Sequence, residues 1–159
     1  MPPRSAGLLL FRAVPDRAPE VFLVHPGGPF YSARRQGVWS LPKGVVEDGE
    51  DERAAAAREF WEETGTRAEG DLVHLGEVRY SRGKTVVAWA VEYRGDGEPF
   101  HGSITFQIEW PPRSGEMKEF PEADEGRFFT VEEARAAILP AQLPFIDRLI
   151  AMLDEQPDV

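Results

Sequence analysis

Short apolar runs alternate with polar turns along the first quarter of the chain. Residues 6–11 (AGLLLF) and 20–25 (EVFLVH) are apolar and flanked by proline-containing stretches, a pattern typical of buried strands. The polar stretch 14–17 (VPDR) predicts a turn between them. Residues 26–37, rich in glycine, proline and cations, predict a loop. The chain then resumes an extended segment at 39–41.

The clearest predicted helix covers residues 51–64 (DERAAAAREFWEET). Its four consecutive alanines have high helix propensity. Asp51 and Glu52 fall in the first turn, where carboxylates favour the positive end of the helix dipole. Gly65 then provides a stop.

The second half of the chain predicts further strands and then closing helices. The β-like runs are 72–80, 85–93 and 103–110, followed by a proline-rich loop at 111–121 and a last short strand at 127–130. The helical patterns cover 131–139 and 142–153. Mixed strands and helices in this order predict an α/β sandwich around one sheet, as a single domain over residues 1–159.

Composition narrows the function classes. The hydrophobic and charged contents, 42% and 29%, are ordinary for a globular protein. The formal net charge of −10 argues against a protein that grips a nucleic-acid polymer through its overall field. It does not exclude a small phosphate ligand, because metal ions and a local basic patch can offset carboxylates. The absence of cysteine excludes disulfides, cysteine-ligated zinc and a thiol nucleophile.

No targeting or membrane segment is predicted. The apolar run at 6–11 is shorter than the roughly 7–15 residues of a signal-peptide core. It is also far shorter than the roughly 20 residues of a membrane span. We therefore expect a cytoplasmic monomer or homodimer with no membrane partner.

Three glutamates of the predicted helix carry the strongest chemical signal. Glu59, Glu62 and Glu63 are spaced i, i+3 and i+4, which places them on one helix face. Their mutual repulsion is relieved if a hard divalent cation such as Mg²⁺ or Mn²⁺ lies among them. Glu50 could reach the same site or pair with Arg58. The alternative is a solvated acidic surface.

The wider string around these glutamates resembles a family motif. From Gly44 it reads G-x5-E-x7-R-E-F-W-E-E-T-G and is similar to the Nudix box over Gly44–Thr66, with all fixed positions present. Phe60 occupies a bulky apolar position, whereas Thr66 replaces the expected aliphatic residue. The resemblance implies an α/β/α sandwich around a mixed sheet. It also implies a metal-dependent hydrolase in which water attacks phosphorus in an X-P-O-P bridge.

Residue roles follow from that resemblance. The metal ligands it implies are Glu59, Glu62, Glu63 and the carbonyl of Gly44, with direct or outer-sphere support from Glu50. Glu62 or Glu63 is also a candidate general base. Arg58 would hold the carboxylates in place through charge-assisted pairs. The cofactor implied is Mg²⁺ or Mn²⁺.

Substrate-binding candidates lie on both sides of the box. Lys43 belongs to a P-K-G entry that resembles Nudix hydrolases of dinucleoside polyphosphates and of diphosphoinositol phosphates. Arg34 and Arg35 could clamp outer phosphates. Tyr80 lies near a position where dinucleoside-polyphosphate members favour tyrosine. The alternative for the lysine and arginines is an exposed loop residue.

Aromatic residues, a further glutamate and the histidines complete the candidates. Phe30, Tyr31 and Trp110 could stack on a base, although packing in the core or a loop is the better explanation for each. Glu122, six residues before Phe128, matches a family E-x5-aromatic spacing and is our choice for a further catalytic residue, with Glu119 and Glu116 behind it. We interpret the three histidines, which show no zinc-ligand spacing, as structural or surface residues.

The predicted function is hydrolysis of a phosphoanhydride bond in a small nucleotide, most simply a dinucleoside polyphosphate or a nucleoside triphosphate. The alternative is a non-catalytic Nudix-fold module that binds a nucleotide or a protein. Degenerate modules of that kind lose acidic residues, and here every acidic residue of the box is present.

Overall fold

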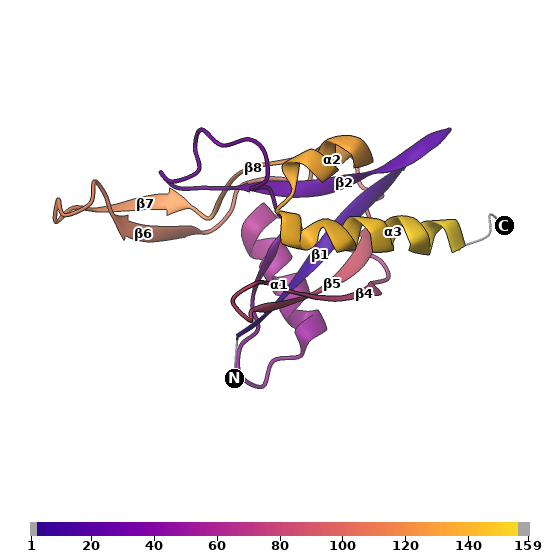
Figure 1. The fold of residues 1–159 in the computed structure, drawn as a ribbon, viewed down its shortest axis with the longest axis horizontal. Helices are drawn as coiled ribbons and strands as arrows, with labels where there is room; N and C mark the ends of the chain where they lie inside the picture. Colours follow the sequence, from indigo (N-terminus) through magenta and orange to yellow (C-terminus); the bar gives the residue numbers. More distant parts are fainter. Residues whose placement is uncertain (1–2, 156–159) are drawn as a thin grey trace.

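The computed structural model describes residues 3–155 and has a mixed six-stranded sheet at its centre (Figure 1). The strand order is β4-β5-β1-β2-β8, and β3 pairs with β1. Their bounds are β1 Arg4–Val14, β2 Arg17–Pro26, β3 Lys43–Val45, β4 Val73–Arg79, β5 Thr85–Glu92 and β8 Ala123–Thr130. β1 pairs parallel with β5 and antiparallel with β2 and β3.

Helices cover both faces of this sheet. Helix α1 (Glu52–Thr64) lies on one face; α2 (Val131–Ala137) and α3 (Leu143–Glu155) lie on the other, with a short 3-10 turn, Pro140–Gln142, between them. This arrangement confirms the predicted α/β/α sandwich. None of the helices in residues 3–155 is both long and apolar enough to cross a membrane.

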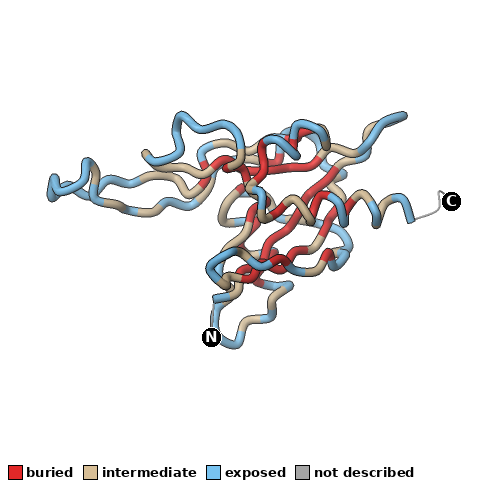
Figure 2. The backbone as a smooth tube through the Cα atoms, viewed as in Figure 1, coloured by how far each residue is buried: buried red, intermediate tan, exposed pale blue. Residues whose placement is uncertain are grey.

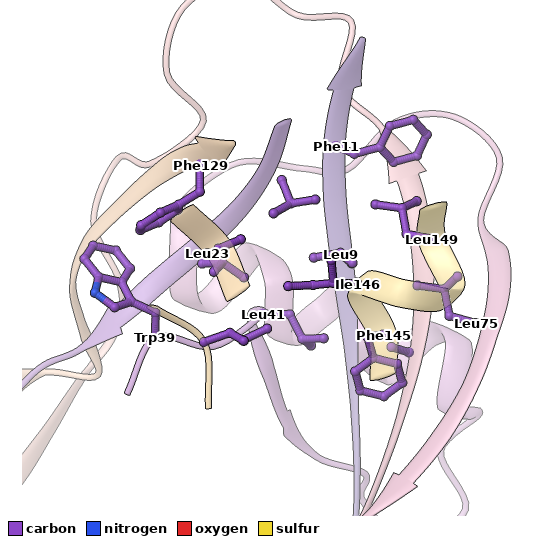
Figure 3. Packing of buried hydrophobic residues seen from close by; sticks show 14 of the residues in the cluster. Leu9, Phe11, Leu23, Trp39, Leu41, Leu75, Phe129, Phe145, Ile146 and Leu149 are labelled. Atoms are coloured by element: carbon purple, nitrogen blue, oxygen red, sulfur yellow. The ribbon is translucent and has the colours of Figure 1, made fainter. Parts of the chain in front are cut away.

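The core divides into two clusters because successive residues of a strand point to opposite faces. Leu8 and Leu10 of β1 pack with Phe60 on the α1 side. Leu9 packs with Phe145 on the side of α3. Figure 2 shows the buried residues concentrated in the sheet, and Figure 3 shows the second cluster around Leu9, Leu23, Trp39 and Ile146.

Helix α1 begins and ends where local chemistry predicts. The Asp51 side chain accepts a hydrogen bond from the Ala54 N–H at 3.0 Å and so caps the first turn. Gly65 adopts a left-handed conformation, with φ of 77°, and its N–H bonds to the Trp61 carbonyl. The helix that carries the glutamates is therefore capped at both ends.

Two predictions for the later part of the chain were wrong. The predicted loop at 111–121 contains strand β7 (Met117–Pro121), which pairs with β6 (Thr105–Glu109) in a separate two-stranded sheet. The last strand begins at Ala123 instead of residue 127. Both stretches mix charged residues with apolar ones, and β7 has no buried residue, so neither shows the apolar run that marks a core strand.

The β6–β7 hairpin projects from the body of the protein (Figure 1) and its base meets α1. The Ile104 N–H donates to the Glu62 carbonyl at 2.8 Å, and the Glu122 N–H donates to the Ile104 carbonyl at 2.9 Å. These two bonds place the start of β8 beside the glutamate face of α1.

Candidate active site

Helix α1 directs Glu59 and Glu63 toward β3 and its apolar side toward the sheet. Glu59 is 8% exposed although it carries a carboxylate, and Phe60, the next residue, is fully buried in the core. A Cβ added at Gly44 would lie 2.0 Å from the Glu59 carboxyl carbon. Glycine at position 44 therefore lets the β3 backbone approach this carboxylate directly.

Arg58 links three of the acidic residues. Its guanidinium donates to both Glu50 oxygens at 2.9 and 3.0 Å, to Glu59 at 2.9 Å and to Glu62 at 3.2 Å. Its pKa is raised, first by the bond to Glu50, and the same bond lowers the pKa of Glu50 to about 2. Of the two arrangements open from the sequence, Glu50 thus adopts the pair with Arg58.

Glu63 is fixed from the strand side. One of its oxygens accepts the backbone N–H of Lys43 at 2.8 Å. Burial raises its pKa to about 8, against the opposing charge and hydrogen bond of Lys43. A carboxyl group held in this way needs a nearby cation to ionise fully at neutral pH.

Glu122, the residue between β7 and β8, joins the same electrostatic cluster. Its pKa is raised, chiefly by burial and then by the negative charge of Glu62, while Lys43 opposes the shift. Glu59 shows the same pattern, with burial first and Glu62 second. Four carboxylates from two parts of the chain therefore influence one another in a partly desolvated space.

This donor set fits a hard divalent cation in its chemistry. The candidate ligands are all oxygens, and the close approach at Gly44 brings backbone next to the Glu59 carboxylate. Among residues 3–155, no three histidine, aspartate or glutamate side chains already surround a common point. Glu59 and Glu62 are turned to Arg58, and Glu63 to the Lys43 amide.

Lys84 lies beside the candidate site, a position that the sequence did not reveal. It lies close enough to Lys43 to lower the pKa of that ammonium, after the larger effect of burial. The lysines meet because β1 pairs with β3 on one side and β5 on the other, with Gly7 opposite Lys43 and Arg4 opposite Thr85. No local pattern signals such a contact across three strands.

The other predicted substrate residues have partners of their own. Arg35 pairs with Glu125 at 2.8 Å and lies over the Trp39 ring. Arg34 lies 5.9 Å from the centre of the Tyr31 ring. The Tyr80 hydroxyl accepts a hydrogen bond from Gln142 at 2.8 Å, and Lys84 lies over its ring. Tyr80 is thus tied to the α3 side of the sheet.

Of the three aromatic candidates, Phe30 and Tyr31 lie in the loop after β2, and Trp110 lies in the turn between β6 and β7. Phe30 contacts Trp110 edge to face, with ring centres 5.4 Å apart, and remains 58% exposed. Tyr31 is 39% exposed. Phe30 and Trp110 thus pack against each other while leaving much of the Phe30 ring accessible. The Phe30 ring can therefore pack against Trp110 and still offer a surface for a ligand to stack on.

Comparison with known proteins assigns the family. A model of the NUDIX domain matches residues 1–149. The chain is 31% identical over 150 residues to an RNA pyrophosphohydrolase of Bradyrhizobium diazoefficiens, covering 82% of this chain and 86% of that protein. A second RNA pyrophosphohydrolase, from Roseobacter denitrificans, is 35% identical over 121 residues, covering 65% and 75%.

Solved structures agree on the fold. A binary complex of an Ap4A hydrolase from C. elegans superposes with a TM-score of 0.65 at 23% identity, covering 96% of this chain and 99% of that one. The Nudix domain of Shewanella oneidensis NrtR, bound to ADP ribose, gives 0.63 at 16% identity, covering 96% and 89%.

The chain therefore belongs to the Nudix family. Together with the intact box, the relatives make it a pyrophosphohydrolase of that family.

Proposed function

We propose that this protein hydrolyses a phosphoanhydride bond in a dinucleoside polyphosphate, with a nucleoside triphosphate as the next choice, using Mg²⁺ or Mn²⁺. The observation that carries the proposal is that acidic and basic side chains gather in one place. The carboxyl groups of Glu59, Glu63 and Glu122 all interact with the ammonium group of Lys43, which in turn lies close to that of Lys84. Such an arrangement suits a cation and a polyphosphate chain bound side by side.

Each group has a role in this proposal. Glu59, Glu62, Glu63 and the Gly44 carbonyl would hold the cation, with Glu50 supporting them through Arg58. When bound, the cation would neutralise phosphate charge and make the attacking water more acidic. Lys43 and Lys84 would bind phosphate oxygens, and Arg34 and Arg35 would contact the outer phosphates.

Glu122 is our choice for the group that accepts the proton of the attacking water, ahead of Glu62 and Glu63. Burial raises its pKa above the ordinary value of a glutamate, a shift in the direction that suits a general base. The bonds of Arg58 go to Glu50, Glu59 and Glu62 instead. Exposed aromatic surface at Phe30 and Tyr31 would stack on a nucleobase.

A second class of substrate is the triphosphorylated end of an RNA chain. It is favoured by the names of the relatives at 27–35% identity, which are RNA pyrophosphohydrolases. The chemistry at phosphorus would be the same. The net charge of −10 disfavours tight binding of a long polymer, so we rank the RNA end below both small nucleotides.

A substrate panel tests the proposal. Diadenosine tetraphosphate, nucleoside triphosphates and a 5′-triphosphorylated RNA are each incubated with Mg²⁺, with Mn²⁺ and with excess chelator, and the products are separated. We expect AMP and ATP from the tetraphosphate, and no hydrolysis with chelator in metal-free buffer. Faster release of pyrophosphate from RNA would favour the RNA end instead. Undiminished hydrolysis under chelation would overturn the metal requirement.

A matched pair of variants guards against a contaminating hydrolase. Glu62→Gln should abolish turnover, because it removes a proposed ligand. Glu69→Gln alters an exposed glutamate on the loop after α1 and should leave turnover unchanged. Equal activity in both variants would mean that the hydrolysis does not come from this site.

A further inference from the structure

His25, near the end of β2, is a fully buried histidine that the proposed chemistry does not use. Its Nδ1 lies 2.8 Å from a carboxylate oxygen of Asp124, and its Nε2 lies 2.6 Å from the carbonyl oxygen of Arg34. The ring also contacts Trp39 edge to face, with centres 5.1 Å apart. Both ring nitrogens are therefore engaged.

Both oxygen partners can only accept hydrogen bonds. A backbone carbonyl has no proton to give, and neither has an ionised carboxylate such as that of the partly exposed Asp124. A neutral imidazole carries one N–H, so one of the two contacts would then set a lone pair against a lone pair. The geometry is satisfied when both nitrogens carry protons and Asp124 supplies the countercharge.

The contact joins two segments that flank the proposed site. Arg34 lies in the loop after β2, which also carries Arg35, whereas Asp124 lies two residues beyond Glu122 on β8. Another bond joins the same two segments, because the Gly27 N–H donates to the Glu122 carbonyl at 2.9 Å. Within the stretch after β2, the Trp39 indole donates to the Arg35 carbonyl at 3.0 Å.

Charged groups surround the ring on each element packed against it. From β8 come Asp124, which bonds the ring, and Glu125 and Arg127; from the loop come Arg34 and Arg35. The guanidinium groups of Arg35 and Arg127 lie 5.0 and 5.6 Å from the centre of the Trp39 ring. The only carboxylate bonded to the imidazole is that of Asp124, among residues 3–155.

We propose that doubly protonated His25 is a positioning residue that holds the loop of residues 26–37 against β8 in the substrate-binding arrangement. The bond from Nε2 to the Arg34 carbonyl is the one that reaches the loop, and the bond from Nδ1 to Asp124 holds the ring on β8. Without the bond to Arg34 the loop would be less firmly held, and substrate would bind less tightly. This inference rests on the proposed function for its kinetic consequence.

Two amide substitutions separate the two bonds. The amide nitrogen of His25→Gln falls near the position of Nε2 and can donate to the Arg34 carbonyl. That of His25→Asn falls near Nδ1 and can donate only to Asp124. We expect KM to rise about tenfold in His25→Asn, as for one lost buried hydrogen bond, with kcat within about twofold of wild type. His25→Gln should keep KM near wild type.

The split between KM and kcat is a readout that a merely structural role would not give, because loss of folded protein would lower the apparent kcat and leave KM unchanged. Equal KM values in the two variants, or a fall in kcat at constant KM, would overturn the proposal.

Amide hydrogen exchange tests the same contact without turnover. The Arg34 N–H, which bonds to the Tyr31 carbonyl at 3.0 Å, should exchange at least about fivefold faster in His25→Asn than in His25→Gln. Equal exchange would refute the role of His25 in holding the loop. If the wild-type protein cleaves no nucleotide in the panel, the proposed function fails. Hydrogen exchange would still test whether His25 holds the loop, because it needs no turnover.

Discussion

The two faces of α1 differ in burial and charge although both belong to the same 13-residue helix. The inner face, with Ala55, Ala56 and Phe60, is fully buried, and Phe60 packs against Phe22 with ring centres 6.4 Å apart. The outer face gathers like charges in partly buried positions, where burial raises the pKa values of Glu59 and Glu63. One face stabilises the fold, whereas the other places like charges where burial opposes their ionisation, which is costly to stability.

Phe60→Ala should have the largest effect on stability. Removing a fully buried ring should lower the free energy of unfolding by about 3–5 kcal/mol, measured by thermal or urea denaturation without metal. Trp61→Ala is the matched control, because Trp61 is 47% exposed on the other side of the helix. It should cost less than about 1 kcal/mol. Similar losses in the two variants would break the contrast between the faces.

Glu63→Gln should affect turnover instead of folding. The change keeps side-chain volume but removes charge from the proposed cation site, so kcat should fall by at least about two orders of magnitude with saturating Mg²⁺. Steady-state kinetics on the best substrate of the panel measure this, with Glu69→Gln as the exposed control. A variant that melts far below wild type yet turns over normally would make Glu63 a structural residue.

Gly44→Ala tests how closely β3 approaches the carboxylate face. The new methyl group would collide with the Glu59 carboxylate, so activity should fall by about tenfold to a hundredfold as that carboxylate is displaced. The same change should have little further effect in a Glu59→Ala background, because the collision partner is gone. Identical fold losses in both backgrounds would show that the contact with Glu59 is not the cause.

The pH dependence of stability gives a smaller effect. Folding raises the pKa of Glu63 from its ordinary 4.5 to about 8, so the folded protein holds a proton that the unfolded chain releases between these values. Stability contributed by this group therefore falls as the pH rises from about 4.5 to 8. Metal-free Glu63→Gln should therefore become more stable relative to wild type as the pH rises through that window. Each 1 kcal/mol of this gain should raise its Tm relative to wild type by about 3 °C.

Melting curves of both proteins at intervals from pH 5 to 9 measure this gain. It should level off above pH 8, where wild-type Glu63 is ionised. A wild-type protein that becomes more stable relative to the variant over this range would contradict the assigned direction of the pKa shift.

Lys43→Ala should give the smallest change, and one that depends on the substrate. If Lys43 binds a remote phosphate, KM should rise roughly fivefold for a tetraphosphate-bridged substrate, a loss on the order of 1 kcal/mol, and less for a diphosphate. Lys118→Ala, on the exposed face of the hairpin, should leave both KM values unchanged. Equal losses on the two substrates would indicate a structural role for Lys43.

Local signals accounted for much of the fold. The cap at Asp51, the alanine run and Gly65 define α1, and the apolar runs of β1 and β2 lie within the observed strands. The spacing of Glu59, Glu62 and Glu63 also placed them on one face. Strand β7 escaped prediction because it is an exposed strand whose partner, β6, supplies its hydrogen bonds.

Contacts between distant strands could not be predicted. Lys84 meets Lys43 only because β5 joins β1 in parallel, and neither residue lies in a pattern that signals the other. The partners of His25 likewise come from a loop and from β8, far apart in the sequence. Glu122 was selected from spacing alone; the hydrogen bonds around Ile104 show how the hairpin brings its backbone to α1.

The central position of β1 has a consequence for how the chain folds during synthesis. β1 pairs early with β2, its neighbour in sequence, but its other long edge is completed only by β5, after α1 and β4 have been made. During synthesis that edge is open, and open strand edges promote association between chains. Shortened versions of the protein that end before Glu92 would keep the edge exposed permanently, and they should aggregate instead of folding.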